Sequence, residues 1–163
     1  MKYEFREKQL INGYNMHRIV AVHDIPMHGV KAGDLGGWIE STGNLSQEGS
    51  CWIKDNSMAY QLARISDNAI VMGAAEVYDM AKVYDEAVIN GMVSVFGLAR
   101  ICKNMTIASI DDYIVLGPFY DKYITFAKDS TGKLIHSTTR CDDEIYKYAN
   151  EVMAYRQMIS VHS

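Results

Sequence analysis

The stretch "AEVYDMAKVYDEAVI", residues 75–89, repeats itself every six residues. A small residue and a β-branched residue both recur with this spacing: Ala75, Ala81 and Ala87, and Val77, Val83 and Ile89. An α-helix cannot use such a pattern, because six residues advance a helix by about 600° and scatter equivalent positions around it. Extended chain that turns a corner every six residues can use it, so the stretch predicts short strands.

The repeat extends outward to ten hexads over residues 49–108. The third place of each hexad is small or apolar in all ten, and the fifth place is β-branched in nine. The first place is Gly or Asp in eight, with Gln61 and Lys103 as exceptions, and both residue types tolerate the backbone of a tight corner. Hexads of this regularity predict a parallel β-helix with 18 residues per coil, hence about three coils and a prism about 16 Å tall.

A short solenoid exposes an edge at each end, so the flanking segments are expected to cap it. Residues 2–25 read as a hairpin around Asn12-Gly13, and residues 113–139 as further strands with a turn at Ser130-Thr131-Gly132. A helix capped by Asp142 or Asp143 follows, with an expected apolar stripe of Ile145, Tyr148, Ala149, Val152 and Ile159. We expect a single domain over 1–163, made of a hairpin cap (1–36), the β-helix (37–108), and C-terminal strands and helix (109–163).

Composition restricts the function classes. The formal net charge is −4 and the pI is near 5.7, which argues against general nucleic-acid binding and against binding to anionic membranes. The first residues are charged and lack an apolar leader, and no apolar run approaches the length of a membrane span, so we expect a cytoplasmic protein. Cys51, Cys102 and Cys141 lack metal-ligand spacing and are expected to be free thiols.

The repeat resembles the hexapeptide-repeat, left-handed β-helix superfamily, in which many members are trimeric acyltransferases. "HRIVAVHDI" (17–25) and "VKAGDLGGWIESTGNLSQEGSCWIKDN" (30–56) are similar to the start of a group of phage, prophage and bacterial hexapeptide-repeat proteins usually labelled as transferases. The resemblance covers roughly residues 17–108, and more loosely the strands and helix that follow. It implies an all-β fold with a C-terminal helix, a left-handed coil, and a phage or prophage origin, which would place the protein in the host cytoplasm.

Acyltransferases of this superfamily use a histidine beside an intersubunit pocket as general base, because its pKa lies near working pH. The five histidines here are His17, His23, His28, His136 and His162, and none lies within residues 49–108. We therefore expect no catalytic residue, with His23 and His28 as the alternatives that could reach a neighbouring subunit's coil. We also expect no metal and no cofactor.

Two short motifs have structural interpretations. "GDLGGW" (33–38) could cradle a phosphate, but the strand and helix that such a loop requires are missing around it. We expect it to form a tight entry into the first coil, with Trp38 covering the end of the core. The acidic run Asp142, Asp143 and Glu144 could ligate a metal, but a capped first helical turn explains it more simply.

Residues 18 apart should stack on the outer surface. An apolar ridge along one edge of the prism is predicted to be an oligomer or partner interface: Tyr60, Leu62, Tyr78, Met80, Phe96 and Leu98. A further apolar column is predicted on another face: Trp52, Ile70, Val88 and Thr106. The ridge suggests self-association as a dimer or a trimer.

A basic column of Arg64, Lys82 and Arg100 stacks on a third line, with Tyr84 beside Lys82. Like charges about 4.8 Å apart repel one another unless solvent, acids or a ligand compensate, so the column is either a solvated strand face or a site for an anionic partner. From these features we expect a non-catalytic binding protein, and the resemblance to phage and prophage proteins implies an accessory role. It would engage a host protein or a protein–nucleic-acid complex. One consequence of this binding would be inhibition of a host defence system such as CRISPR. The alternatives are an acyl-CoA-dependent acyltransferase and a structural virion or assembly component.

Overall fold

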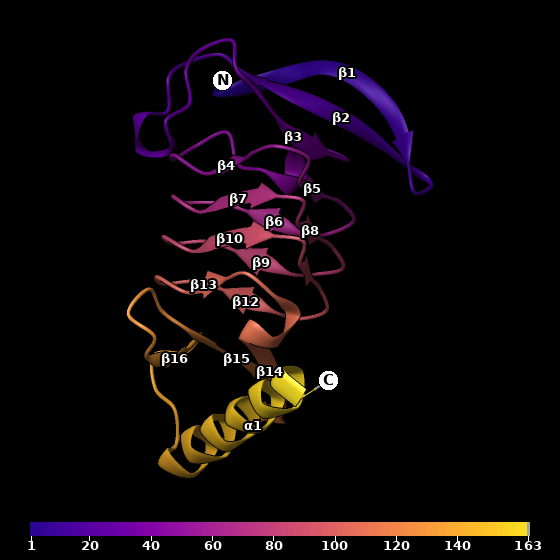
Figure 1. Ribbon diagram of the computed structural model, residues 1–163. Coiled ribbons are helices and arrows are strands. Elements are labelled where there is room, and N and C mark those ends of the chain that lie inside the picture. The colour runs from indigo at the N-terminus through magenta and orange to yellow at the C-terminus, as the bar shows by residue number, and fades with distance from the viewer. Residues whose placement is uncertain (163) are drawn as a thin grey trace.

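The computed structural model describes residues 1–162 and shows a stack of parallel coils with a cap at each end (Figure 1). The chain enters through an N-terminal hairpin at the top of the view, winds down the stack and leaves through a small antiparallel sheet and a helix. The expected class, mostly β with a short left-handed parallel β-helix and a C-terminal helix, is confirmed.

Three parallel sheets form the sides of the prism. The first contains β3 (Leu35–Ile39), β5 (Met58–Ala59), β8 (Glu76–Val77) and β11 (Ser94–Val95). The second contains β4 (Trp52–Ile53), β7 (Ile70–Gly73), β10 (Val88–Gly91) and β13 (Thr106–Ile107). The third contains β6 (Arg64–Ile65), β9 (Lys82–Val83) and β12 (Arg100–Ile101).

The solenoid has about four coils, one more than the hexad count predicts. The additional coil precedes residue 49, where the hexad count begins. In this coil β3 pairs with β5 in the first sheet, and Leu45 bridges to Ile65 in the third. The hexad pattern fails there because the short 3₁₀ helix η2 (Thr42–Asn44) replaces one regular corner. The Asn44 side chain joins it to the next coil by donating to the carbonyl oxygens of Gln61 and Ala63, at 3.1 and 2.8 Å.

The interior follows the hexad pattern closely. All twenty third-place and fifth-place side chains of residues 49–108 are buried, and all of them except Ser57 form one continuous apolar core along the axis. Small residues alternate with β-branched ones because the coil leaves little space beside each corner and more at the centre of each side. Burial of these side chains supplies the apolar driving force that holds the coils together.

The corners explain the first place of each hexad. All ten first-place residues have positive φ, from +53° at Lys103 to +129° at Gly91. The Asp and Gln corners add a second contribution that dihedral preference alone does not predict, because their side chains accept hydrogen bonds from the coil below. Asp67 Oδ2 accepts from the Asp85 amide at 3.1 Å, Asp85 Oδ2 accepts from the Lys103 amide at 2.9 Å, and Gln61 Oε1 accepts from Asp79 in the same way.

The N-terminal cap is the expected hairpin. Strands β1 (Tyr3–Ile11) and β2 (Tyr14–Ala21) pair around Asn12-Gly13, both in the left-handed region, and β2 joins the first sheet through β3. A 3₁₀ turn, η1 (Pro26–His28), follows. The core end is closed by Tyr3, Ile19 and Trp52, all fully buried, with the ring of Tyr3 edge-on to that of Trp52.

Trp38 does not cover the core end, contrary to expectation. Its neighbour Ile39 takes the inward position, so Trp38 lies on the outer face of β3, where the Arg18 guanidinium sits 5.3 Å from its ring centroid. The glycines of "GDLGGW" are needed for packing: a Cβ on Gly36 would meet Trp52 at 2.7 Å, and one on Gly37 would meet the Ser57 carbonyl at 2.4 Å. The motif therefore forms the tight coil entry, as expected.

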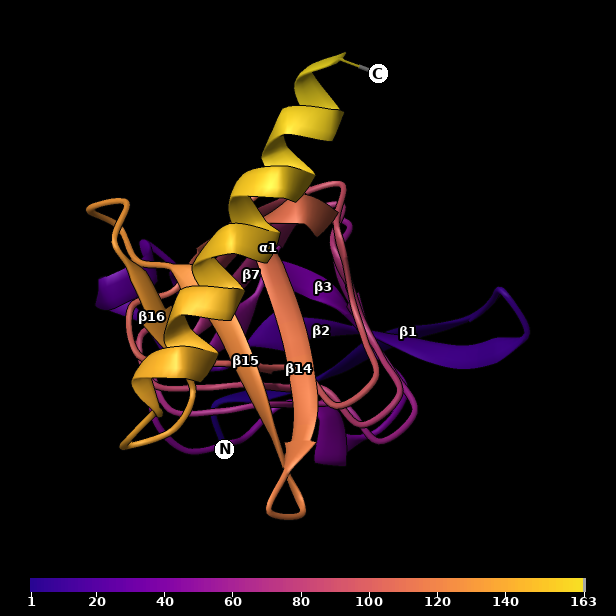
Figure 2. The same ribbon diagram turned by 90° about the horizontal axis from the view of Figure 1, so that it is seen from below.

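The C-terminal cap is an antiparallel sheet covered by a helix, and Figure 2 shows α1 lying across β14 and β15. A 3₁₀ turn, η3 (Ile110–Asp112), leads into β14 (Tyr113–Phe119), β15 (Lys122–Lys128) and β16 (Leu134–His136), and α1 covers Asp143–His162. The turn at residues 130–132 is as predicted. Among the described residues, no helix is long and apolar enough to span a membrane.

The buried face of α1 differs in part from the predicted stripe. Ala149 is fully buried in a second core with Phe126, and Ile145 and Val152 are partly buried against it. Tyr148 and Ile159 are about half exposed, however, and Met153 takes the buried position instead. The helix lies on a small sheet and buries only a narrow face, so the ends of a wider stripe remain in solvent.

Candidate functional site

The apolar ridge is present as predicted, with three aromatic rings stacked along one edge of the prism. Tyr60 and Tyr78 have ring centroids 5.3 Å apart, and Tyr78 and Phe96 are 5.5 Å apart, both pairs nearly parallel. Tyr14 of the hairpin extends the stack, 4.8 Å from Tyr60. The aliphatic half of the ridge is open to solvent, with Leu62 74%, Met80 55% and Leu98 43% exposed.

The further apolar column predicted on another face does not form an outer surface, so that prediction is wrong. Trp52, Ile70, Val88 and Thr106 do stack along the second sheet, but Trp52 and Ile70 are buried. They belong to one core cluster with Ile25 and Val30 of the loop between β2 and β3. The same loop is fixed to the corner before β7 by a 3.0 Å contact between His28 Nε2 and the Asn68 carbonyl oxygen.

The basic column also stacks as predicted, and the structure separates its members. Arg64 pairs with Lys82 and Lys82 with Arg100 in the parallel register of the third sheet, and all three side chains are exposed. Lys82 and Arg100 line a cavity of about 400 Å³, whereas Arg64 does not. The column is therefore divided between a concave site at its C-terminal end and an open face above it.

The cavity is the candidate functional site, and we call it the C-terminal cleft. It lies where the C-terminal cap folds back against the last two coils, and its volume is within the range of small-molecule sites. Its walls combine the ridge, the basic column and residues of the cap: Met80, Lys82, Leu98, Arg100, Asp121, Lys122, Tyr123, Ser137 and Thr138.

Hydrogen bonds fix the cap side of the cleft to the coils. Thr125 Oγ1 accepts from the Arg100 amide at 2.8 Å, which attaches β15 to β12. Ser137 Oγ accepts from the Thr125 amide at 3.0 Å, and Lys103 Nζ donates to the Thr138 carbonyl oxygen at 2.9 Å. The wall formed by Ser137 and Thr138 is thus connected to the solenoid at two points.

The charge of the cleft is unbalanced. Within residues 1–162 the one ion pair joins Arg156 to Asp111, so no carboxylate lies within ion-pair distance of Lys82, Arg100 or Lys122. Asp121 contributes one acid to the lining, against three cations. Three cations that converge on one cavity without acidic partners create a positive potential that favours an anionic ligand.

Tyr84, predicted to assist the basic column, faces the protein instead of the cleft. Its ring is partly buried against the core, and burial raises the pKa of its hydroxyl to about 12, with Cys102 adding to the shift and Arg100 opposing it. Arg100 is thus next to Tyr84 on one side and lines the cleft on the other. Tyr84 is therefore not part of the cleft lining.

The histidines considered from the sequence lie far from the cleft. His23 and His28 belong to the loop after β2 at the N-terminal end of the stack. The cleft is lined by residues of the last coils and the C-terminal cap, and β12 and β15 lie at the opposite end (Figure 1). His17 stacks on Phe5 in the hairpin, with ring centroids 4.1 Å apart. The side chain of His162 is outside the described part. His136 directly precedes Ser137 and Thr138 of the cleft wall. It was not a candidate from the sequence because no periodicity indicates that β16 folds back against the last coils.

The hydrogen bonds of His136 define its tautomer. Thr138 Oγ1 donates its proton to the Arg140 carbonyl oxygen at 2.7 Å, so it accepts from His136 Nδ1–H at 2.9 Å. Nε2 then carries a lone pair in the neutral ring. Burial lowers the pKa of His136, and the Lys103 ammonium lowers it further, so the neutral form predominates at pH 7. A neutral imidazole held in this way can accept a proton.

The acidic run before α1 serves as a helix cap. Asp142 Oδ1 accepts from the Glu144 amide at 2.9 Å, which satisfies a free donor in the first turn. Asp143 and Glu144 lie in that turn, where negative charge is favoured by the helix dipole. The capping interpretation of this run is therefore confirmed.

Comparison with known proteins gives one relevant similarity. Over 84 residues the chain is 36% identical to the uncharacterized acetyltransferase YdcK of Escherichia coli (strain K12). The match covers 45% of this chain and 25% of the relative, so the chain spans about a quarter of that protein. No family model matches the chain.

The repeat, the coil geometry and this partial relative all fit the hexapeptide-repeat β-helix superfamily. The similarity therefore agrees with the general resemblance found from the sequence.

Proposed function

We propose that this protein is an acyl-CoA-dependent acyltransferase whose donor binds in the C-terminal cleft. The observation that carries the proposal is the convergence of Lys82, Arg100 and Lys122 on one cavity without acidic partners. Coenzyme A is an anion rich in phosphate, and phosphate oxygens form strong charge-assisted hydrogen bonds with lysine and arginine. Met80, Leu98 and Tyr123 give the same cavity apolar surface for the uncharged part of the donor.

His136 is the residue we propose for proton transfer; it does not line the cleft itself but the neighbouring cavity, with Lys103, Cys141 and Tyr146. In acyl transfer from a thioester, the acceptor's oxygen or nitrogen forms a bond to the acyl carbon, the carbon–sulfur bond breaks, and the acceptor loses a proton. His136 Nε2 has a lone pair available, but it is Nδ1 that contacts Thr138 of the cleft wall, so the acceptor would reach Nε2 from the neighbouring cavity. The imidazole takes the acceptor's proton and passes it to the leaving thiolate.

Calorimetry with acetyl-CoA tests donor binding. The wild-type protein should bind in the micromolar range, and Lys82→Glu with Lys122→Glu should weaken binding at least tenfold. Arg64→Glu is the matched control, because Arg64 belongs to the same column but lies outside the cleft. If the wild-type protein does not bind acetyl-CoA, or if Arg64→Glu weakens binding as much as the double substitution, the proposal is wrong.

The second candidate is a non-catalytic binding protein, and the uninterrupted coils favour it. Residues 49–108 contain no histidine and no inserted loop, unlike the superfamily's acyltransferases. In this case the exposed column of Arg64, Lys82 and Arg100 recognises an anionic host macromolecule, and the protein is a phage or prophage accessory factor that antagonises a host defence. Charge reversal of all three residues should then abolish capture of a partner from host lysate, whereas acetyl-CoA should not bind.

The exposed ridge gives both candidates a surface for self-association. Leu62, Met80 and Leu98 present aliphatic side chains to solvent along one edge, and the stacked aromatic rings lie beside them. We propose that a dimer or trimer covers this ridge. Sedimentation of Leu62→Glu against wild type should show a smaller assembly, and an unchanged mass would contradict this assignment.

A further inference from the structure

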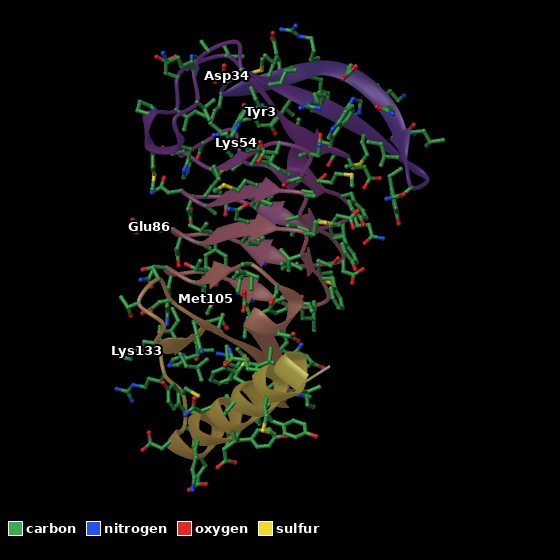
Figure 3. All side chains as sticks on the ribbon, in the orientation of Figure 1. Tyr3, Asp34, Lys54, Glu86, Met105 and Lys133 are labelled. Atoms are coloured by element: carbon green, nitrogen blue, oxygen red, sulfur yellow. The ribbon has the colours of Figure 1, made fainter. Side chains whose placement is uncertain are left out.

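A lysine and a cysteine are held in contact inside the N-terminal cap. Lys2 is 5% exposed and Cys51 is fully buried, yet Lys2 Nζ lies 3.1 Å from Cys51 Sγ. Tyr3, which follows Lys2, is labelled at this end of the prism in Figure 3. Neither residue belongs to the C-terminal cleft, so the pair is independent of the proposed function.

The surroundings of the pair fix its geometry from both sides. Lys2 Nζ also donates to the carbonyl oxygens of Glu48 and Gly49, at 3.1 and 3.3 Å. The Lys2 amide donates to Gln47 Oε1 at 2.8 Å, which joins the start of β1 to the turn before Cys51. Within the described chain no carboxylate lies at ion-pair distance from Lys2, so the thiol is its one ionisable neighbour at hydrogen-bond distance.

We propose that Lys2 and Cys51 form a reversible covalent bridge, Nζ–O–Sγ, when the protein is exposed to a hydroperoxide. The sulfur and nitrogen need only a small movement to accept one bridging oxygen. Cys102 and Cys141 have no lysine nitrogen within hydrogen-bond distance of sulfur among the described contacts, so they do not share this chemistry.

The reaction balances with two equivalents of peroxide. Cys51 sulfur attacks the first peroxide, the O–O bond breaks, and a sulfenic acid and water form. Lys2 Nζ releases a proton to solvent, attacks the second peroxide in the same way, and gives a hydroxylamine and water. The hydroxylamine oxygen then attacks the sulfenic sulfur and displaces water, which forms the bridge. Each peroxide accepts two electrons, and excess thiol reverses the oxidation.

A path for the oxidant lies beside the pair. A solvent-open cavity of about 220 Å³ is lined by Lys2, Gly49 and Ser50, together with residues of the loop after β2. Hydrogen peroxide is close to water in size and fits such a cavity. It can therefore reach the region of the Lys2 ammonium and the backbone next to Cys51 without unfolding the cap.

The bridge has a structural consequence. It links residue 2 covalently to residue 51, and so fixes β1 to the first turns of the solenoid. A cross-link that closes a loop of this length restricts the unfolded chain, so oxidation should raise the Tm by about 5 °C or more. The pair would act as an oxidant-dependent clamp on the N-terminal cap.

Peptide mass spectrometry of the full-length protein tests the proposal. After treatment with hydrogen peroxide, trypsin should release residues 1–6 joined to residues 32–54, with a mass about 14 Da above the sum of the two, since one oxygen is gained and two hydrogens are lost. Dithiothreitol should restore the separate peptides. Oxidation should also raise the Tm of the wild-type protein, and the same reductant should return it.

Three variants serve as controls. Lys2→Arg keeps the positive charge but lacks the amine, and Cys51→Ser lacks the sulfur, so neither should give the joined peptide. Cys102→Ser should give it as wild type does. The proposal is overturned if Cys51 is oxidised while Lys2 stays unmodified, if a different lysine is joined to Cys51, or if neither residue reacts in a folded wild-type protein.

Discussion

Asp85 offers a direct test of how the corners stabilise the solenoid. Its backbone has φ +54°, and its carboxylate accepts from the Lys103 amide in the coil below at 2.9 Å. Substitution by alanine removes this hydrogen bond and leaves a residue with a poor tolerance of left-handed backbone. Asparagine keeps both an acceptor oxygen and the tolerance. The two variants therefore differ in the two contributions that the structure attributes to this position.

The expected magnitudes follow from the two contributions. A hydrogen bond at an exposed corner contributes about 0.5–1 kcal/mol, and a left-handed conformation costs an ordinary residue about 1–2 kcal/mol. Asp85→Ala should thus lower the free energy of unfolding by about 1.5–3 kcal/mol. Asp85→Asn should stay within about 0.5 kcal/mol of wild type, and Asp85→Gly should lie between them because it relieves the backbone strain but loses the hydrogen bond.

Urea unfolding monitored by circular dichroism measures these differences, with equal m-values required for the comparison. Glu86→Ala is the matched control, because Glu86 is the next residue, is exposed, and makes no side-chain hydrogen bond among the described contacts. It should change the free energy of unfolding by less than about 0.5 kcal/mol. If Asp85→Ala has the same free energy of unfolding as Asp85→Asn, neither the hydrogen bond to the next coil nor the tolerance of left-handed backbone stabilises this corner.

The remaining predictions concern the core, the aromatic stack, pH and salt. Ile89→Ala empties a fully buried fifth-place position and should cost about 2–5 kcal/mol in urea unfolding, whereas Ile89→Val should cost about 0.5–1.5 kcal/mol. Tyr78→Ala removes two stacked contacts and should destabilise by at least about 1 kcal/mol, and Tyr78→Phe, which keeps the ring, should not. The pKa values of His28 and His136 are lowered, mainly by burial, so the unfolded chain binds more protons near pH 6. The contribution of these two histidines to the free energy of unfolding should therefore be full above about pH 6.5 and decrease as the pH falls below it. The double substitution His28→Asn with His136→Asn should flatten this pH dependence in Tm measurements at pH 5.5–7.5. Acetyl-CoA affinity should decrease steadily as salt is raised, because the cleft cations are solvent-accessible, and a salt-independent affinity would contradict an electrostatic role for them.

The solenoid could be predicted from the sequence because one physical requirement repeats along it. Each corner needs positive φ and each side needs one small and one β-branched residue, so ten copies of the pattern reinforce one another. The expected β-helix bounds of 37–108 include the first coil, but the hexad count does not, because that coil meets the same requirement by different means. There, Asn44 satisfies backbone carbonyls in place of a regular corner, and Gly36 and Gly37 admit neighbouring atoms too close for a side chain.

The candidate site was predictable only in part, for a related reason. The 18-residue spacing places Lys82 above Arg100 and Met80 above Leu98, because parallel register depends on sequence separation alone. Lys122, Tyr123, Ser137 and Thr138 reach the same cavity through the folding back of β15 and β16, and no periodicity encodes that contact. Trp52 and Ile70 show the opposite case, where a correctly placed column was covered by a loop that the repeat does not describe.

The position of the cleft follows from the geometry of a solenoid. The side of a regular prism is nearly flat, since equivalent residues stack at a constant spacing, and a flat face cannot surround a small ligand. Concavity arises where the repeat ends and the chain folds back, which here brings Lys122 opposite Lys82 and Arg100. Arg64 lies one coil away from this boundary and has the same charge without the opposing wall. Substitution of Lys82 should consequently weaken ligand binding more than substitution of Arg64. The two residues nevertheless pair directly in the third sheet, and both side chains are exposed.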